Sequence, residues 1–396
     1  MPLNRSLYYF ALFLVLYELA TYLANDMILP GMVQVIHEFH AANRYIAMSL
    51  SLFILGNCTL IMIAGSLAEH YGKRLMILLG SASFLMFTLL LAYSHSIHSF
   101  MAWRYFEGCG LAVITIGYGL IHSHFNDRKA VKLISLMGNV SVLAPLIGPI
   151  LGTIIVSFCS WRAVFYFTLL LAIPAFIGLW RYTPRDCPPI PLPDKQPLFK
   201  QYALLLRHKA FVQGTLCIIL ITMPLLLWIS QAPNLILLTL KQNYLHYVLY
   251  QFISIFGICI ATFLMQSLAG NYSMSGIIKV GGYFLLSGLI FSTVFHANIW
   301  LVVVGQFFYT LGLGLANGCL YRLVLSIKIC STNVLSTLLG FSQSLCYALG
   351  IALCNSFLQY WQYSVLSFTL MTLLFGCCAF YMMRKTATFY QQRQWE

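Results

Sequence analysis

Twelve apolar runs, each about 20 residues long, alternate with short polar breaks along this chain of 396 residues. Because about 20 apolar residues cross the hydrocarbon core of a bilayer, each run is long enough to form one transmembrane helix. The first run lacks the small-residue cleavage site of a signal peptide, so we expect it to remain in the protein. The sequence predicts an all-α integral membrane protein with spans at 8–28, 45–66, 75–95, 99–121, 133–157, 163–181, 211–237, 247–268, 277–296, 299–325, 333–357 and 364–383.

Charged residues make up 8% of the chain, against about a quarter in an ordinary soluble domain. The formal net charge is +13, but Lys and Arg stand singly or in twos and threes between the apolar runs. A nucleic-acid site would need them clustered on a soluble face, so we expect no nucleic-acid partner. The pattern is instead typical of the cytoplasmic loops of a membrane protein.

The motifs of enzymes and metal sites are missing from the sequence. The adjacent Cys377 and Cys378 have no second pair at metal-ligand spacing, so we expect no metal site. We find no phosphate-binding loop, no glycine-rich dinucleotide fingerprint and no acid–His–nucleophile set. We therefore expect a protein that is not an enzyme and that has no cofactor. A membrane enzyme or receptor subunit remains the alternative from another class.

The central polar stretch, 182–209, contains six of the thirteen prolines and should form an extended connector. It separates six predicted spans from six others. The predicted domains are an N-terminal bundle at 1–181, a cytoplasmic proline-rich linker at 182–209 and a C-terminal bundle at 210–396. Such a duplicated arrangement is typical of secondary transporters. A second long loop is expected at 30–44.

The distribution of Lys and Arg predicts the orientation in the membrane, because cytoplasmic loops carry the excess of these residues. With the N-terminus inside, the inner loops and tails hold seventeen Lys and Arg residues and the outer loops hold three, Arg44, Arg162 and Lys241. Both termini are therefore expected to be cytoplasmic.

Three acids fall within predicted spans: Glu18 and Asp26 in the first and Glu107 in the fourth. The two on the first span lie within about 80° of each other and about 12 Å apart along the helix. A charge at bilayer depth costs at least about 2.5–3.5 kcal/mol, which makes such residues functional candidates. The alternatives are an anchoring role for Asp26 at the outer interface and a structural hydrogen bond for Glu18.

Arg104 and Glu107 stand at positions i and i+3 of the fourth span, where their side chains can meet. One interpretation is a self-neutralising pair that serves stability only. An Arg within the membrane needs more hydrogen-bond acceptors than one carboxylate supplies, however. A carboxylate between burial and a nearby cation can titrate when the local geometry changes, as a proton-coupled carrier requires.

Two glycine-containing segments suggest close helix contacts or turns. The short loop predicted between spans two and three reads GSLAEHYGKR (65–74), and span five contains APLIGPILG (144–152). The second segment permits a bend and a close approach to a neighbouring helix.

These two segments resemble signature motifs of the major facilitator superfamily and of its drug/proton antiporter branch. Further segments resemble the MdfA-type multidrug/proton antiporters: LYELATYLANDMILPGM in span one, WRYFEGCGLA in span four, LMGNVSVLAPLIGP in span five, PLLLWISQAP in span seven and LGLGLANGCLYRL in span ten. The resemblance covers nearly the whole chain and weakens in the central loop and the last helices. It implies twelve helices in two six-helix bundles.

The resemblance also implies roles for individual residues. The proton-coupling residues would be Glu18, Asp26 and Arg104, with Glu107 added where the family usually has Gln. The helix-five motif would comprise Pro145, Gly148, Pro149 and Gly152. A conformational latch would comprise Gly65, Glu69, Gly72, Lys73, Arg74 and Arg322. An adaptable drug cavity would be lined by Tyr22, Asn25, Asp26, Leu111, Met137, Asn139, Leu225, Leu226 and Ile229.

The function implied is export of lipophilic or cationic compounds in exchange for protons, by a monomer in the lipid of a bacterial inner membrane. The proton gradient would be the energy source. A dedicated metabolite or siderophore permease on the same fold is the alternative, and Glu107 is the departure from the family pattern that keeps it open.

Overall fold

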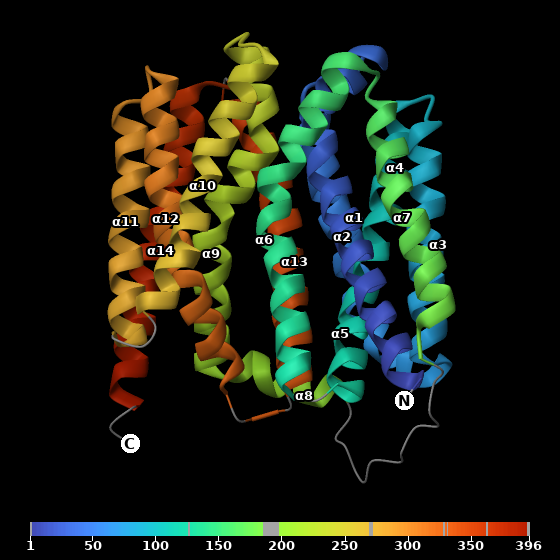
Figure 1. The fold of residues 1–396 in the computed structure, drawn as a ribbon. Coiled ribbons are helices and arrows are strands. Elements are labelled where there is room, and N and C mark those ends of the chain that lie inside the picture. Colours follow the sequence, from blue (N-terminus) through green and yellow to red (C-terminus); the bar gives the residue numbers. More distant parts are fainter. Residues whose placement is uncertain are drawn as a thin grey trace. The chain divides into compact units, whose positions relative to one another are not determined.

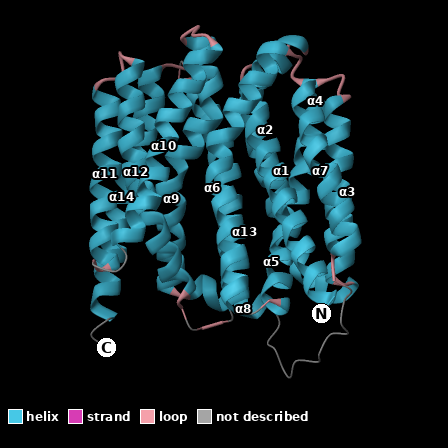
Figure 2. Cartoon of the chain, in the orientation of Figure 1, coloured by secondary structure: helices cyan, strands magenta, loops and turns pink. Residues whose placement is uncertain are grey.

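The computed structural model describes residues 2–125, 127–184, 198–268, 272–327, 329–330, 332–361 and 363–393. Helices and short turns make up these residues, and the described ranges contain no strand (Figure 2). The chain divides into two compact units, Met1–Leu192 and Pro193–Glu396. Residues 185–197 of the predicted proline-rich linker lie outside the described residues.

The first unit is built around its first helix (Figure 1). In this unit α1 packs mainly against α6 and α7, α2 packs against α4, and α3 contacts α4 and α7. The bounds are α1 (Pro2–Glu38), α2 (Arg44–Tyr71), α3 (Lys73–Ala92), α4 (Ile97–Cys109), η1 (Gly110–Ala112), α5 (Val113–His124), α6 (Asp127–Phe158) and α7 (Arg162–Tyr182).

In the second unit α12 packs against both α10 and α11, while α9 contacts α12, α13 and α14. The bounds are α8 (Leu198–Arg207), α9 (Lys209–Ala232), the π-helical segment η2 (Pro233–Thr239), α10 (Tyr244–Leu268), α11 (Met274–Val294), α12 (Ile299–Leu325), α13 (Thr332–Tyr360) and α14 (Val365–Arg393).

Ten helical segments of the described chain are long and apolar enough to cross a bilayer, and they correspond to ten of the twelve predicted spans. The fifth predicted span is α6, whose apolar part is Leu143–Phe158. The fourth is divided among α4, η1 and α5, which follow one another without a gap. The tight turn η1 begins at Gly110, whose carbonyl accepts a hydrogen bond of 2.8 Å from the Tyr17 hydroxyl of α1.

The expectation of a loop at 30–44 is wrong for residues 30–38, because α1 continues to Glu38 with Pro30 inside it. The reason is burial: Met32 and Val35 are fully buried, so this part of the helix covers the core of the unit. Gln34 links it to the next elements. Its Nε2 donates to the Val156 carbonyl and its Oε1 accepts from the Trp161 N–H, each at 2.9 Å.

The expected loop at 65–74 is also much shorter than predicted. α2 continues to Tyr71 and α3 begins at Lys73, so Gly72 alone forms the turn. Its φ of 99° lies in the region that residues with a Cβ rarely adopt, which explains a glycine at this position.

The last part of the predicted linker is helical rather than extended. Leu198–Arg207 forms the amphipathic helix α8, in which Tyr202 and Leu205 are buried. The apolar residues recur at helical spacing and give this short helix a face that packs on α9 and α13.

Candidate functional site

Among the described residues of the first unit, four charged side chains are buried, on two of its helices. Glu18 and Asp26 belong to α1, and Arg104 and Glu107 belong to α4. Asp26 is 3% exposed and the other three are fully buried. The unit therefore contains, at helix positions that face protein, the groups that the sequence analysis selected for proton coupling.

Glu18 lies between α1 and α5. Its Oε1 accepts a hydrogen bond of 2.8 Å from the hydroxyl of Tyr118, and its backbone carbonyl accepts one of 2.8 Å from Thr21 Oγ1. The carboxylate is thus oriented by a tyrosine from another helix. Glu18 and Asp26 have different surroundings, although they share one helix.

Arg104 has partners on three other side chains, as its burial requires. Its Nη1 pairs with Glu107 Oε2, its Nε donates to Ser49 Oγ at 3.1 Å, and its Nη2 reaches Asn25 Oδ1 at 3.5 Å. The guanidinium carbon also lies 4.7 Å from the ring centroid of Phe53. Arg104 therefore connects α4 to both α1 and α2.

Glu107 and Asp26 lie at the two ends of this network. Glu107 Oε1 accepts a hydrogen bond of 2.8 Å from Thr88 Oγ1 of α3, while Oε2 faces Arg104. At the other end, Asp26 Oδ1 accepts from Asn25 Nδ2 at 3.0 Å. The side chains form a continuous series from Thr88 through Glu107, Arg104 and Asn25 to Asp26. Such a series can respond to the gain or loss of a proton at Asp26.

The helix-five motif lies directly against this acid. A Cβ added at Gly148 would lie 2.6 Å from the Asp26 Cβ, and one added at Gly152 would lie 2.7 Å from the Met27 carbonyl carbon. Both distances are too short for real contacts, so the two glycines permit the close approach of α1 and α6. Within the same motif Pro149 is buried and Pro145 is half-buried.

The predicted cargo-lining residues divide between the two units. In the first, Met137 is buried and Tyr22, Asn25 and Leu111 are half-buried; the side chain of Asn139 lies outside the described residues. In the second, Leu225 and Ile229 are buried and Leu226 is half-buried, all on α9. Their role in cargo binding stays a prediction.

A tyrosine from α12 is inserted into the backbone of α9 next to these residues. The Tyr309 hydroxyl accepts a hydrogen bond of 2.9 Å from the Leu225 N–H and donates one of 2.8 Å to the Ile221 carbonyl. In a regular helix these two backbone groups would bond to each other. Pro224, which lacks an N–H, stands inside the same turn. Tyr309 thus fixes the backbone from which Leu225 and Ile229 project.

The predicted latch residues lie at the α2–α3 turn and at the end of α12. Arg74 Nη1 donates to the Thr183 carbonyl at 2.9 Å and Nη2 to the Trp180 carbonyl at 2.7 Å, so this side chain caps the C-terminal end of α7. Gly65 is exposed, Lys73 is half-buried, and the side chain of Glu69 lies outside the described residues. Arg322 is exposed in the last turn of α12.

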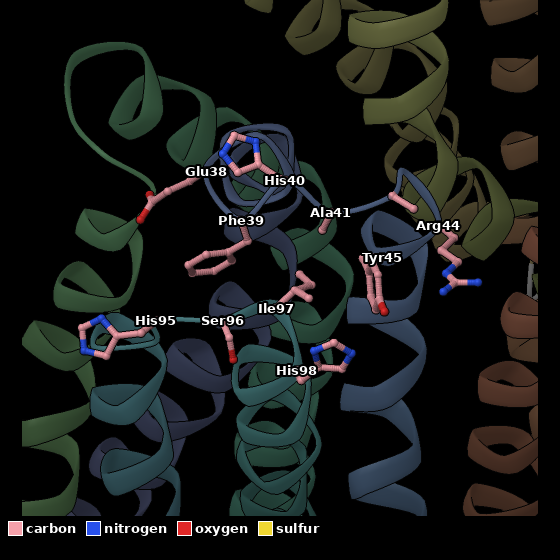
Figure 3. Close-up of a pocket in the computed structure, with 11 residues that line it drawn as sticks. Glu38, Phe39, His40, Ala41, Arg44, Tyr45, His95, Ser96, Ile97 and His98 are labelled. Carbon is pink, nitrogen blue, oxygen red and sulfur yellow. The ribbon is translucent and has the colours of Figure 1, made fainter.

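An open pocket of about 550 Å³ lies at the end of the first unit where α1 connects to α2 and α3 connects to α4. Figure 3 shows its histidines spread around the rim, with His95 and His98 on different sides and His40 above. All three side chains are exposed. Within the described ranges no three His, Cys, Asp or Glu side chains are close enough to hold a metal ion. The buried network is therefore the stronger candidate site.

The sequence analysis did not select three partners of the buried charges: Ser49, Thr88 and Tyr118. Each is a small or aromatic polar residue within a predicted span, and such residues are frequent in membrane helices. In the folded unit Thr88 and Ser49 contact α4, but no sequence signal separates them from the other hydroxyl residues of the same spans.

Known protein families and relatives match this chain along most of its length. Residues 14–354 match the Major Facilitator Superfamily. The chain is 32% identical over 362 residues to the Multidrug transporter MdfA of Yersinia pestis bv. Antiqua (strain Angola), covering 89% of this chain and 87% of that one. It is 33% identical over 358 residues to the protein of the same name from Escherichia coli O157:H7, covering 88% and 87%.

Two solved structures share the fold at low sequence identity. A bacterial homologue of the human lysosomal transporter Spinster superposes with a TM-score of 0.74 at 12% identity, covering 97% of each chain. The human organic anion transporter MFSD10 (TETRAN) gives 0.65 at 14% identity, covering 97% of this chain and 100% of that one. The predicted fold class, an all-α membrane protein of twelve spans, is confirmed. The chain belongs to the major facilitator superfamily and, within it, resembles the MdfA multidrug transporters along most of its length.

Proposed function

We propose that this protein is a proton-coupled secondary transporter that exports lipophilic small molecules by alternating access. The observation that carries the proposal is the buried acid Asp26 on α1, hydrogen-bonded to Asn25 and connected through it to Arg104. The relatives of this chain are named multidrug transporters, which favours a broad range of lipophilic cargo over one dedicated metabolite.

In the proposed cycle a proton and the cargo compete for the acids of α1. A proton taken up from outside neutralises Asp26 or Glu18 and displaces the cargo. The protonated carrier then opens to the inside, loses the proton at the higher pH there, and binds cargo again. A ligand shifts such an equilibrium only through its different affinity for the two states, so competition at the acids supplies the coupling.

We also propose an oligomeric state, a membrane and an orientation for the carrier. We place it as a monomer in the lipid of a bacterial inner membrane, with both termini cytoplasmic, on the excess of Lys and Arg in the predicted inner loops. The proton gradient supplies the energy, and no enzymatic step or cofactor is involved. Tyr22, Asn25 and Met137 of the first unit and Leu225 and Ile229 of the second would contact the cargo.

We further propose that the turn between α2 and α3 forms part of a conformational latch. Because Arg74 holds the end of α7 by two hydrogen bonds, the turn and α7 should move as one piece when the carrier changes conformation. The other residues of the proposed latch are Gly65, Glu69, Gly72, Lys73 and Arg322.

Proton release from purified protein in detergent tests the function. Adding a lipophilic cation or a neutral antibiotic should release protons from the wild-type protein and should release none from Asp26→Asn. Glu38→Gln is the matched control, because Glu38 is also an acid of α1 but lies at its exposed end in an ion pair with Arg162. It should behave like the wild type. Folded wild-type protein that binds neither compound would contradict the proposal in favour of a dedicated permease.

A further inference from the structure

The buried network contains one more acid than is needed to balance Arg104. With all groups ionised, Arg104 contributes one positive charge, and Glu107 and Asp26 contribute one negative charge each. Glu107 is the direct ion-pair partner of the guanidinium, three residues along the same helix. Asp26 reaches the guanidinium through the amide of Asn25. The charge of Arg104 is therefore matched by Glu107, and the charge of Asp26 remains.

Glu107 is held more firmly than Asp26. Both of its carboxylate oxygens are occupied, one by Arg104 and the other by the Thr88 hydroxyl at 2.8 Å, and the side chain is fully buried. Its two partners come from two helices, α3 and its own α4. A proton added to Glu107 would have to replace the contact with Arg104 and leave a buried guanidinium unbalanced, which is costly. This geometry favours a carboxylate that stays ionised.

Asp26 is held less firmly, and the hydrogen bond to its carboxylate does not come from a cation. Its hydrogen-bond donor is a neutral amide on the adjacent residue of the same helix, and the side chains of Asn25 and Tyr22 beside it are only half-buried. A neutral donor compensates a buried charge less well than a cation does. Of the two acids in this network, Asp26 is therefore the one that gains more from a proton or from the positive charge of a bound molecule.

We propose that Glu107 is a specificity-determining residue: as the fixed counter-ion of Arg104 it leaves the charge of Asp26 unbalanced, and it thereby favours cationic over neutral cargo at this site. Glu107 does not itself exchange protons. Asn25 is a positioning residue, because the bond from Arg104 to its Oδ1 turns its amide nitrogen toward Asp26. This inference rests on the proposed function and names the charge of the cargo at the same site.

The test compares the binding of two probes to purified full-length protein: tetraphenylphosphonium, a lipophilic cation, and chloramphenicol, which is neutral. In Glu107→Gln the positive charge of Arg104 loses its direct counter-ion and instead balances the negative charge of Asp26. The Kd for tetraphenylphosphonium should then rise about tenfold or more, while the Kd for chloramphenicol stays within about twofold. Glu107→Asp retains the charge, so its cation affinity should remain closer to that of the wild type.

Two further variants separate charge from packing. Arg104→Gln combined with Glu107→Gln removes both members of the pair and returns the local charge to that of Asp26 alone, so cation binding should recover relative to Glu107→Gln. Glu38→Gln should leave both affinities unchanged. Thermal unfolding of each variant verifies folding, and if Glu107→Gln does not fold, the Glu107→Asp and double variants decide the question.

The outcomes distinguish this inference from the function on which it rests. Wild-type protein that binds neither probe contradicts the proposed function. Wild-type protein that binds both, with a Glu107→Gln variant that loses both equally or retains the cation, overturns the role of Glu107 and leaves the function intact. A Glu107→Asp or double variant with no tetraphenylphosphonium binding, in folded protein that still binds chloramphenicol, overturns it as well.

Discussion

Replacement of Gly152 by Ala should disturb the packing of α1 against α6 beside the buried acid. The added Cβ would lie 2.7 Å from the Met27 carbonyl carbon and 2.8 Å from its Cα. Ordinary contacts between carbon atoms need about 3.5–4.0 Å, so the two backbones must separate by roughly 1 Å. Both neighbouring atoms belong to the backbone, so no side-chain rotation can relieve the contact.

Overpacking of this kind typically costs about 1–3 kcal/mol. For a unit of about 190 residues, each 1 kcal/mol lowers the melting temperature by about 2–4 °C. We therefore expect the melting temperature of Gly152→Ala in detergent to fall by about 2–12 °C. Because Asp26 precedes Met27, the proton release described above should also weaken.

The matched control is Gly119→Ala in α5, where an added Cβ would meet no atom within 4 Å. There the higher helix propensity of Ala should leave the melting temperature unchanged or raise it, since Ala is favoured over Gly by about 0.5–1 kcal/mol within a helix. Equal melting temperatures for Gly152→Ala and the wild type, with Gly119→Ala showing no loss, would refute the close approach of α1 and α6.

Two further predictions concern hydrogen bonds to backbone groups. Tyr309→Phe should leave the buried Leu225 N–H and Ile221 carbonyl without the hydroxyl that now bonds to both, and should lower the free energy of unfolding by about 1–3 kcal/mol. Chemical denaturation measures this free energy. An unchanged value would contradict the insertion of the Tyr309 hydroxyl. Arg74→Ala should remove the cap at the end of α7 and lower the free energy of unfolding by about 0.5–1.5 kcal/mol, whereas Arg74→Lys should recover only part of this loss. Hydrogen exchange in the last turn of α7 should increase in both variants. Unaltered exchange would argue against the cap.

The positions of the helices could be predicted from the sequence because the length of an apolar run is a local property. The scarcity of acids also selected Glu18, Asp26 and Glu107 without any structural information. The extension of α1 could not be predicted in this way. Residues 30–38 mix polar and apolar types, and only the packing of Met32 and Val35 in the folded unit makes a helix the better solution.

The pairing within the buried network was only partly predictable. The spacing of Arg104 and Glu107 on one helix indicated their contact, since it depends on local geometry. The contacts with Ser49 and Asn25 depend on which helices become neighbours, and that is decided by close approaches such as Gly108 of α4 against the Phe53 backbone of α2. A single sequence shows the glycine but not the helix that it meets.

The structure links the charge of Asp26 to the position of α1. Its carboxylate is joined to Arg104 through Asn25, and its Cβ lies beside Gly148, where α6 approaches α1 closely. A movement of α1 relative to α4 would therefore change the contact between Asn25 and Arg104, and with it the electrostatic environment of Asp26. If a proton or cation binds at Asp26 as proposed, it would by reciprocity change the preferred position of α1 by the same free energy. Hydrogen bonds to charged groups are worth about 1.5–3 kcal/mol, which is also the scale of one close helix contact, so neither effect overwhelms the other. In the proposed cycle this balance would allow a single proton to change the conformation, which is a reason for the acid to lie at a close contact of two helices rather than in an open cavity.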